Sequence, residues 1–458
     1  MKKLLIIATL AAVGMGACSK DDGVSAPEDL RKYVQVTIPE NAASGETRTS
    51  VDGTTTSWVA GDRVAVSLYN GSTTEVCEFT ADRTGATTTF SGSVPVGSYT
   101  CAAAHYPFCA ATFDAVNKTF THTWGDAYCS TDLAAYDFMF STVYETPFVV
   151  DETTTVLPIA LTFRPLMARI GMKLALGANE TPKYVTFTTK DNVLPTAGTV
   201  NADGTFSASA LTNSLTVETD RKEFTVGLLP VGVASKMSVH VTTTDGMTYS
   251  DKSFQLAGLK RNTHYTMNVP CRTKRFMLTV PDGVDTKYGT GTYKNNEFYS
   301  VDPATDPTGI FKDWYFYRAE LKNTTNTASG DKLKGKNRIQ LQVAPWFNNS
   351  NNGAFVTAPI QCDGTKTVTV SFTAATNRAM SAKYWIGVTD NGPITSDWLR
   401  DINKISPHAE GSIPMSDNVS HSHTFTVTNG QRIMMKVYSS GGGTPCHLEL
   451  ADFTYTVE

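Results

Sequence analysis

The chain has 458 residues, of which 18% are charged, and a formal net charge of -4. Lys and Arg form no runs, so the chain lacks the clustered positive charge that a phosphate-binding surface needs, and nucleic acid is excluded as a partner. Thr, Ser, Gly, Val and aromatic residues dominate, while helical periodicity is nearly absent. This composition favours strands joined by turns, and the length is enough for two to three domains.

The first residues have the three-part layout of a secretory signal. Lys2 and Lys3 are positive, Leu4 to Val13 is apolar, and small residues then lead to a cysteine, Cys18. The apolar run has about half of the roughly twenty residues that a membrane-spanning helix needs. We therefore expect residues 1–17 to be a signal peptide that is removed.

The residues around Cys18 predict a lipid anchor. Met15-Gly16-Ala17-Cys18 resembles a lipobox, which implies a palmitate-type lipid on Cys18, and Ser19-Lys20-Asp21-Asp22 resembles the surface-export signal of Bacteroidetes lipoproteins. The expected product is a lipoprotein exposed on the cell outer membrane, with residues 18–32 as its tether. The alternatives are a soluble secreted protein cleaved elsewhere and an ordinary polar tether.

Residues 33–156 are predicted to form a first β-sandwich. Tyr33 to Pro39 alternates as a half-buried strand does, with Val34, Val36 and Ile38 on one face. Trp58 and a turn at Gly61-Asp62 precede the next strand. The other predicted strands cover Val64–Leu68, Glu75–Thr80, Thr88–Ser93 and Gly97–Tyr106, and a polar stretch runs from Asp114 to Tyr136.

A second sandwich is predicted for residues 157–272. The expected strands cover Tyr184–Thr189, Gly198–Phe206, Phe224–Leu229, Met237–Thr244 and His264–Val269. Turn compositions punctuate them at Asp191-Asn192, Ala202-Asp203-Gly204 and Asp245-Gly246. This spacing of short strands is typical of a β-sandwich.

Several short motifs in this region occur in an order that resembles the fimbrillin family of Bacteroidetes, which supplies subunits and anchors of type V pili. They are Thr47-Arg48-Thr49, Trp58 with Gly61-Asp62, Phe163 to Ile170, Leu228-Leu229-Pro230 and Lys260 to Thr266. The resemblance implies two tandem β-sandwich domains, export as a lipoprotein, and assembly with other pilus subunits by strand exchange.

In strand exchange, a protease cuts after an arginine, the first strand leaves, and an extended strand of a neighbour fills the groove. The resemblance points to Arg48 as the processing site and to Val34, Val36 and Ile38 as the removable strand. In the alternative, Arg48 is an ordinary loop residue and the first strand stays in place, as in an anchor.

Residues 273–458 are predicted to form one further sandwich. Its strands are expected at Phe276–Val280, Trp314–Leu321, Arg338–Val343, Thr367–Thr373, Lys383–Val388, His423–Val427, Gln431–Tyr438 and Leu448–Val457. The order loosely resembles jelly-roll modules that bind carbohydrate on surface proteins. In the Trp314 segment, Trp314 and Phe316 should face one side and Tyr315 and Tyr317 the other.

Three tryptophans of this last domain are candidate ligand contacts. Trp346 and Trp398 lie in loop-like contexts rich in Asn, Asp and Arg, and Trp385 lies on a predicted strand. An aromatic ring can stack on the apolar face of a sugar while polar neighbours bind its hydroxyls. Packing in the core is the more common role of a tryptophan.

No motif predicts catalysis. The chain has no G-x-S-x-G, H-E-x-x-H, P-loop or dinucleotide fingerprint. His421 and His423 share a strand face, but without a third ligand they predict no metal site. Asp452 is a candidate to help hold a structural calcium ion. Cys101–Cys109 and Cys362–Cys446 are candidate disulfides.

The sequence thus predicts an all-β, three-domain surface lipoprotein without enzymatic activity. The added third domain favours a tip or accessory adhesin of a fimbria over a stalk subunit, because a large appended domain would obstruct stacking. The ligand would be a host or dietary glycan. The alternative is a surface glycan-binding lipoprotein of a nutrient-uptake system.

Overall fold

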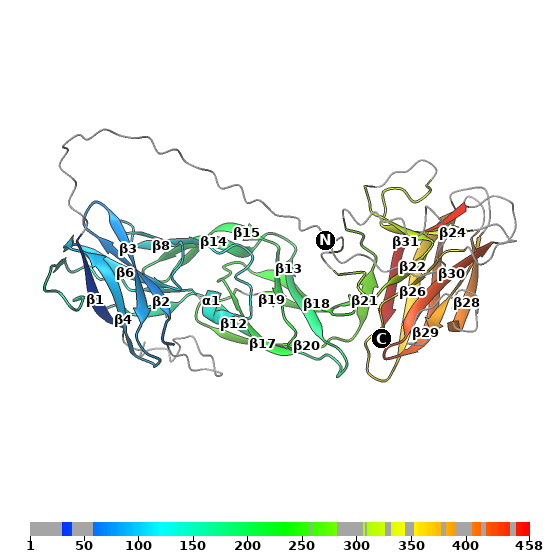
Figure 1. Ribbon diagram of the computed structural model, residues 1–458, viewed down its shortest axis with the longest axis horizontal. Helices are drawn as coiled ribbons and strands as arrows, with labels where there is room; N and C mark the ends of the chain where they lie inside the picture. The colour runs from blue at the N-terminus through cyan, green and yellow to red at the C-terminus, as the bar shows by residue number, and fades with distance from the viewer. Residues whose placement is uncertain are drawn as a thin grey trace, which may run out of the picture.

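The computed structural model describes residues 30–38, 58–136, 138–256, 258–281, 306, 309–325, 331–343, 352–376, 382–389, 405–413, 418–439 and 446–458. Strands dominate these residues, and they form an elongated row from the N-terminal to the C-terminal end (Figure 1). The described helix α1 covers Leu133–Tyr136. In the described part of the chain, no helix has the length and apolar character needed to cross a membrane. The predicted all-β class is confirmed.

The first sheet has seven strands in the order β1-β4-β3-β2-β6-β9-β11. Their bounds are Arg31–Ile38 (β1), Arg63–Tyr69 (β2), Thr74–Ala81 (β3), Thr88–Pro95 (β4), Cys101–Tyr106 (β6), Met139–Ser141 (β9) and Phe163–Pro165 (β11). A small second sheet pairs β5 (Gly97–Tyr99) with β10 (Phe148–Val150). Trp58 lies in the core of this unit, 4.9 Å from Phe90 and 5.5 Å from Tyr106 between ring centroids.

The middle of the chain contributes to three sheets. A three-stranded sheet has β12 (Ala168–Leu174) between β17 (Glu223–Leu228) and β20 (His264–Val269). A four-stranded sheet has the order β15 (Phe206–Thr212), β14 (Leu194–Asn201), β8 (Thr119–Thr123) and β7 (Thr112–Asp114). The third contains β16 (Ser214–Glu218), β13 (Pro182–Thr189), β18 (Ser235–Thr243) and β19 (Thr248–Leu256).

Two sequence-based expectations are corrected here. The polar stretch from Asp114 to Tyr136 contains strand β8, which pairs with β14 of the middle unit, so tertiary pairing overrides its polar composition. The predicted strand from Gly198 to Phe206 is a hairpin instead. Its turn has Gly204 at φ 91°, a conformation that glycine adopts without a steric penalty.

The last sheet of the middle unit continues into the C-terminal unit. Strand β21 (Lys274–Met277) pairs with β19 on one side and with β31 (Cys446–Val457) on the other. The result is a ten-stranded sheet with strands from both sides of residue 272 (Figure 1). Its other members are β23 (Ala319–Lys322), β24 (Arg338–Val343), β26 (Thr365–Thr376) and β29 (Val419–Thr428).

Facing it is a five-stranded sheet in the order β22-β25-β30-β27-β28. The bounds are Tyr315–Tyr317 (β22), Ala354–Val356 (β25), Ala382–Thr389 (β27), Ile405–Ile413 (β28) and Arg432–Ser439 (β30). The predicted strand Trp314–Leu321 is broken at Arg318, where φ is 46°, and its two halves join different sheets.

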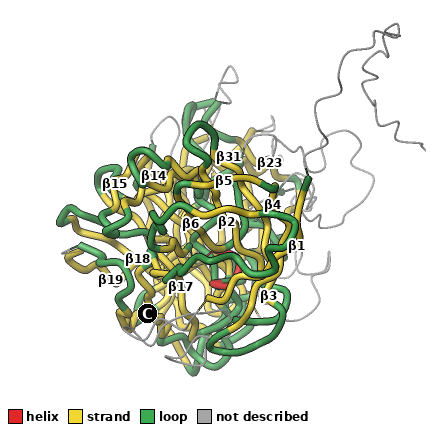
Figure 2. The backbone as a smooth tube through the Cα atoms, turned by 90° about the vertical axis from the view of Figure 1, so that its left-hand side faces the viewer, coloured by secondary structure: helices red, strands yellow, loops and turns green. Residues whose placement is uncertain are grey.

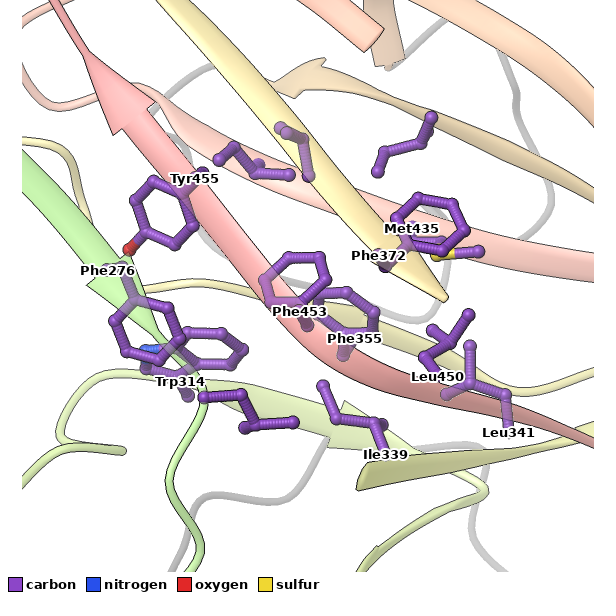
Figure 3. Close-up of a cluster of buried hydrophobic side chains, with 14 of the residues drawn as sticks. Phe276, Trp314, Ile339, Leu341, Phe355, Phe372, Met435, Leu450, Phe453 and Tyr455 are labelled. Atoms are coloured by element: carbon purple, nitrogen blue, oxygen red, sulfur yellow. The ribbon is translucent and has the colours of Figure 1, made fainter. Parts of the chain in front are cut away.

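Aromatic and aliphatic side chains fill the C-terminal core (Figure 3). Trp314 and Phe316 are fully buried in it, as their alternation predicts. Phe276 of β21 stacks on Tyr455 of β31, with ring centroids 5.0 Å apart, and also lies 5.0 Å from Trp314. Strand β21 therefore contributes to the C-terminal core although its other edge pairs with the middle unit.

A buried charged network fastens this junction. Lys274 Nζ lies 2.8 Å from Glu180 Oε1 and 2.9 Å from Asp245 Oδ2, and its side chain is 1% exposed. It also donates to the carbonyl oxygen of Gln361 in the C-terminal unit. Tyr249 Oη donates to Glu180 Oε1 at 2.6 Å. Both carboxylates thus share the one ammonium group of Lys274, in a cluster that spans the two units.

The candidate disulfide between Cys101 and Cys109 is wrong, because both residues are free thiols. Cys77, Cys129, Cys271 and Cys362 are buried thiols that form no disulfide, so they pack as small side chains. The side chain of Cys446 lies outside the described residues.

Candidate functional site

Strand β1 lies at the edge of the first sheet and pairs in register with β4 from Arg31↔Pro95 to Ile38↔Thr88. Val34 and Val36 are fully buried and Ile38 is 1% exposed, while Tyr33 on the other face is 67% exposed. The predicted alternation is therefore confirmed. Figure 2 shows β1 at the periphery, next to β4. A strand in this position can leave without breaking the order of the remaining strands.

Few bonds hold the second edge of β1. The Gln35 main chain donates to Thr155 O at 2.9 Å and accepts from Leu157 N at 2.8 Å. Lys32 Nζ donates to Glu152 O at 2.6 Å. Removal of β1 would therefore open an apolar groove with β4 along one wall and residues 152–157 along the other.

The proposed processing and anchoring residues, Arg48 and Cys18, lie outside the described residues. The turn after them follows its predicted form. Val59 N donates to Asp62 Oδ2 at 2.8 Å, and Gly61 has φ 94°. Trp58 is 1% exposed, so it is a core residue.

A second candidate site lies on the outer side of the five-stranded sheet. We call it the aromatic face and define it by Tyr315, Tyr317, Trp385, Glu410, Arg432 and Lys436. The strand register places Lys436 opposite Trp385, and Trp385 opposite Glu410. Trp385 Nε1 donates to Glu410 Oε1 at 3.0 Å. Trp346 and Trp398, the other predicted ligand contacts, lie outside the described residues.

Cations lie over the aromatic rings of this face. Lys436 Nζ is 5.5 Å from the centroid of Trp385, and the guanidinium carbon of Arg432 is 5.5 Å from that of Tyr315. Trp385 and Tyr315 are half-buried, and each packs against Met434 and its apolar neighbours. Burial lowers the pKa of both Lys436 and Arg432. The face therefore combines stacking surfaces with positive charge.

The outer side of the ten-stranded sheet has a different character. The lining of a groove of about 770 Å³ there includes hydroxyl side chains, most of them from β26, β29 and β31, and the charged residues Arg275, Lys336 and Asp452. Its aromatic members among the described residues are Phe372, which is a core residue, and half-buried His421. Asp452 accepts from Lys336 Nζ at 2.6 Å and from Thr373 Oγ1 at 3.2 Å. The calcium site remains a prediction.

The two strand histidines converge on one hydroxyl. Tyr384 Oη lies 2.9 Å from His421 Nδ1 and 2.8 Å from His423 Nε2. Burial lowers the pKa of both imidazoles. Among the described residues, no group of three or more His, Cys, Asp or Glu side chains could hold a metal ion.

Sequence reasoning singled out Trp385 but missed the cations beside it. Arg432, Met434 and Lys436 occupy every second position of β30 and so share one face of the sheet. That alternation is visible in the sequence. Their placement next to Trp385 and Tyr315 depends on the pairing of distant strands, which the sequence does not reveal.

These features define an all-β protein with a peripheral first strand and an added domain with an aromatic outer face. The sequence model of the family described as fimbrillin-like matches residues 47–283. The chain belongs to this family, whose members are fimbrial and adhesin structural proteins rather than enzymes. None of the curated proteins compared with the chain matches it.

Three solved structures are similar to part of the chain. The tip fimbrial protein Mfa3 of Porphyromonas gingivalis, with a C-terminal truncation, is 13% identical over 55% of this chain and 96% of its own, with a TM-score of 0.28. A fimbrial assembly protein of Parabacteroides distasonis ATCC 8503 is 10% identical over 55% and 96%, with a TM-score of 0.31. A Bacteroides uniformis ATCC 8492 protein, provisionally named a cell adhesion protein, is 18% identical over 53% and 94%, with a TM-score of 0.36.

Proposed function

We propose that the chain is a tip or accessory adhesin of a fimbria, assembled when a neighbouring subunit's strand replaces β1. The peripheral, apolar position of β1 is the observation that carries this proposal. Burial of a Val or Ile side chain is worth about 1.5–3 kcal/mol, so loss of Val34, Val36 and Ile38 leaves a groove that strongly favours a replacement strand.

Cleavage explains why the exchange is controlled. While β1 remains covalently attached, its effective concentration at the groove is high, and a free strand cannot compete. A cut at Arg48 makes β1 a separate peptide that can be diluted away. The groove can then accept a strand by main-chain pairing along β4 and by side-chain pockets at alternate positions.

The C-terminal unit supplies the adhesive function in this proposal. Trp385 and Tyr315 on the aromatic face offer half-buried rings, and Glu410 beside them is exposed, which is the combination that stacks a sugar and binds its hydroxyls. A lipid on Cys18 would hold the subunit at the outer membrane. Labelling with a palmitate analogue should tag the wild type and leave Cys18→Ala unlabelled, and equal labelling would contradict the anchor.

Limited trypsin treatment tests strand acceptance. After cleavage in the Arg48 loop, the protein should take up a fluorescent peptide with the sequence Tyr33 to Thr47, or associate into larger species. A matched peptide carrying Val36→Asp should not bind, because its charge would enter the groove. Arg48→Ala should resist cleavage and take up neither peptide.

The opposite result is equally clear. If the cut protein keeps its first strand through gel filtration, remains monomeric and takes up no peptide, it does not accept a strand. The protein would then be an anchor or a free-standing glycan-binding lipoprotein of a nutrient-uptake system.

A further inference from the structure

Lys436 is a buried cation without a counterion in the described part of the chain. It lies on β30 between Ala354 of β25 and Trp385 of β27. The residue is 6% exposed. It forms no ion pair or hydrogen bond with any residue that the structure describes. Its Nζ does lie over the ring of Trp385, 5.5 Å from the ring centroid.

Such a burial is unfavourable by itself. A charge removed from water is ordinarily paired, and a cation–π contact returns about 0.5–2 kcal/mol, which is less than the cost of desolvation. By contrast, Lys274 at the junction is 1% exposed but has two carboxylates within 3 Å. Lys436 therefore differs from a structural buried lysine of the same protein.

Arg432 repeats the arrangement on the same strand. It is 8% exposed, and its Nη1 donates to two main-chain oxygens, Asp313 O at 2.7 Å and Thr357 O at 2.9 Å. Its Nε has no hydrogen-bond partner, and no carboxylate forms an ion pair with it among the described residues. Four residues of strand separate the two cations by about 13 Å.

The neighbouring strand β28 contributes Glu410. This residue is exposed, and it is bonded to Trp385 Nε1 rather than to Lys436. An acceptor, a stacking ring and an ammonium group therefore follow one another across β28, β27 and β30.

Building on the glycan-binding function proposed above, we infer that the aromatic face binds an acidic saccharide. A sugar ring would stack on Trp385, and its carboxylate would be the missing counterion of Lys436. A second acidic group along the same chain would reach Arg432. A charge-assisted contact of this kind is about twice as strong as a neutral hydrogen bond, so the acid group would determine which glycan is selected.

The test uses the full chain and a set of uronate- and sialate-bearing oligosaccharides, each paired with its carboxyl-reduced form. The wild type should bind at least one acidic form about tenfold or more tighter than its reduced partner. Lys436→Gln should abolish that preference, and Lys436→Arg should keep most of it. Trp385→Ala should weaken both forms. Lys366→Gln, on the other sheet, is the matched control.

Stability gives a second measurement. Because no carboxylate of the described residues pairs with Lys436, Lys436→Met should leave the melting temperature unchanged or raise it. Retained acid preference in Lys436→Gln, or a large loss of stability in Lys436→Met, would overturn the inference. Equal binding of the acidic and reduced forms would overturn the inference that the face selects an acidic saccharide, but it would leave the proposed glycan binding intact. If the wild type binds neither these pairs nor neutral glycans, glycan binding itself fails.

Discussion

Strands β1 and β21 both connect parts of this molecule, but they are held in opposite ways. Strand β1 lies at a sheet edge and is fastened by main-chain pairing with β4 and by three apolar side chains. Strand β21 lies inside a ten-stranded sheet and carries Lys274, which pairs with two buried carboxylates. In the proposed exchange, a similar strand from another chain would replace β1. Strand β21 can leave only if buried charges lose their partner.

This difference fits the adhesin proposed above. In that proposal the N-terminal end would be the place for exchange, because apolar pockets and main-chain edges accept any strand with the right alternation. The junction should be rigid, because the β19, β21 and β31 ladder is continuous and Asp363 of the C-terminal unit accepts from Ala178 N at 2.7 Å. Force on the aromatic face would therefore reach the fimbrial units through a fixed joint.

The largest effect is expected at the junction. Lys274→Met leaves Glu180 and Asp245 buried together without a cation, which should cost about 3–5 kcal/mol of unfolding free energy. Urea unfolding should show the loss, and hydrogen exchange should increase in β19 and β21. The control Lys173→Met breaks an exposed pair with Glu223 and should change little. A Lys274→Met protein as stable as this control would show that the junction is not fastened by its charges.

Acid should loosen the sheet that holds β1. Burial lowers the pKa of His105 on β6 to about 4, and its Nδ1 has no hydrogen-bond partner. The unfolded chain, with an ordinary histidine pKa, binds the proton more readily than the folded one. Stability contributed by neutral His105 is therefore complete above about pH 6.5 and falls as the pH decreases towards 4, by about 2–3 kcal/mol.

The variant His105→Gln isolates this contribution. Its unfolding free energy should depend less on pH between 7 and 4 than that of the wild type, by the same amount. His122 also has a pKa lowered by burial and lies near His105, so the comparison must keep His122 unchanged. Parallel pH profiles for both proteins would contradict the assignment.

The sequence predicted what depends on local alternation. The apolar face of Val34, Val36 and Ile38, the turn at Gly61-Asp62 and the alternation at Trp314 and Phe316 all follow from side-chain periodicity, and the structure confirms them. What depends on distant partners was missed. Strand β8 has a polar composition and becomes a strand only by pairing with β14. In the sequence Lys274 is an ordinary charged residue, and only the fold places Glu180 and Asp245 beside it.

The candidate sites show the same difference between features set by local pattern and features set by distant partners. Trp385 was identified from its residue type, since an aromatic residue on a surface strand can be recognised in a sequence. The lack of a described counterion for Lys436 could not be identified from the sequence, because it depends on the residues that the fold places around Lys436.

The smallest effect, and the one closest to the proposed exchange, is expected from Ile38→Ala at the end of β1. The residue is 1% exposed, and its loss should cost about 2 kcal/mol, at the low end for a buried Ile, because the edge of the sheet can relax around the gap. Since β1 is peripheral, the cost should appear mainly as local opening, with faster hydrogen exchange at Val34 and Val36 and little change in β19 or β21. The matched variant Tyr33→Ala, on the exposed face, should change neither. If Ile38→Ala instead destabilises the whole chain to the same extent as it opens β1, the first strand is part of one cooperative unit with the rest, and a neighbour's strand could replace it only after global unfolding.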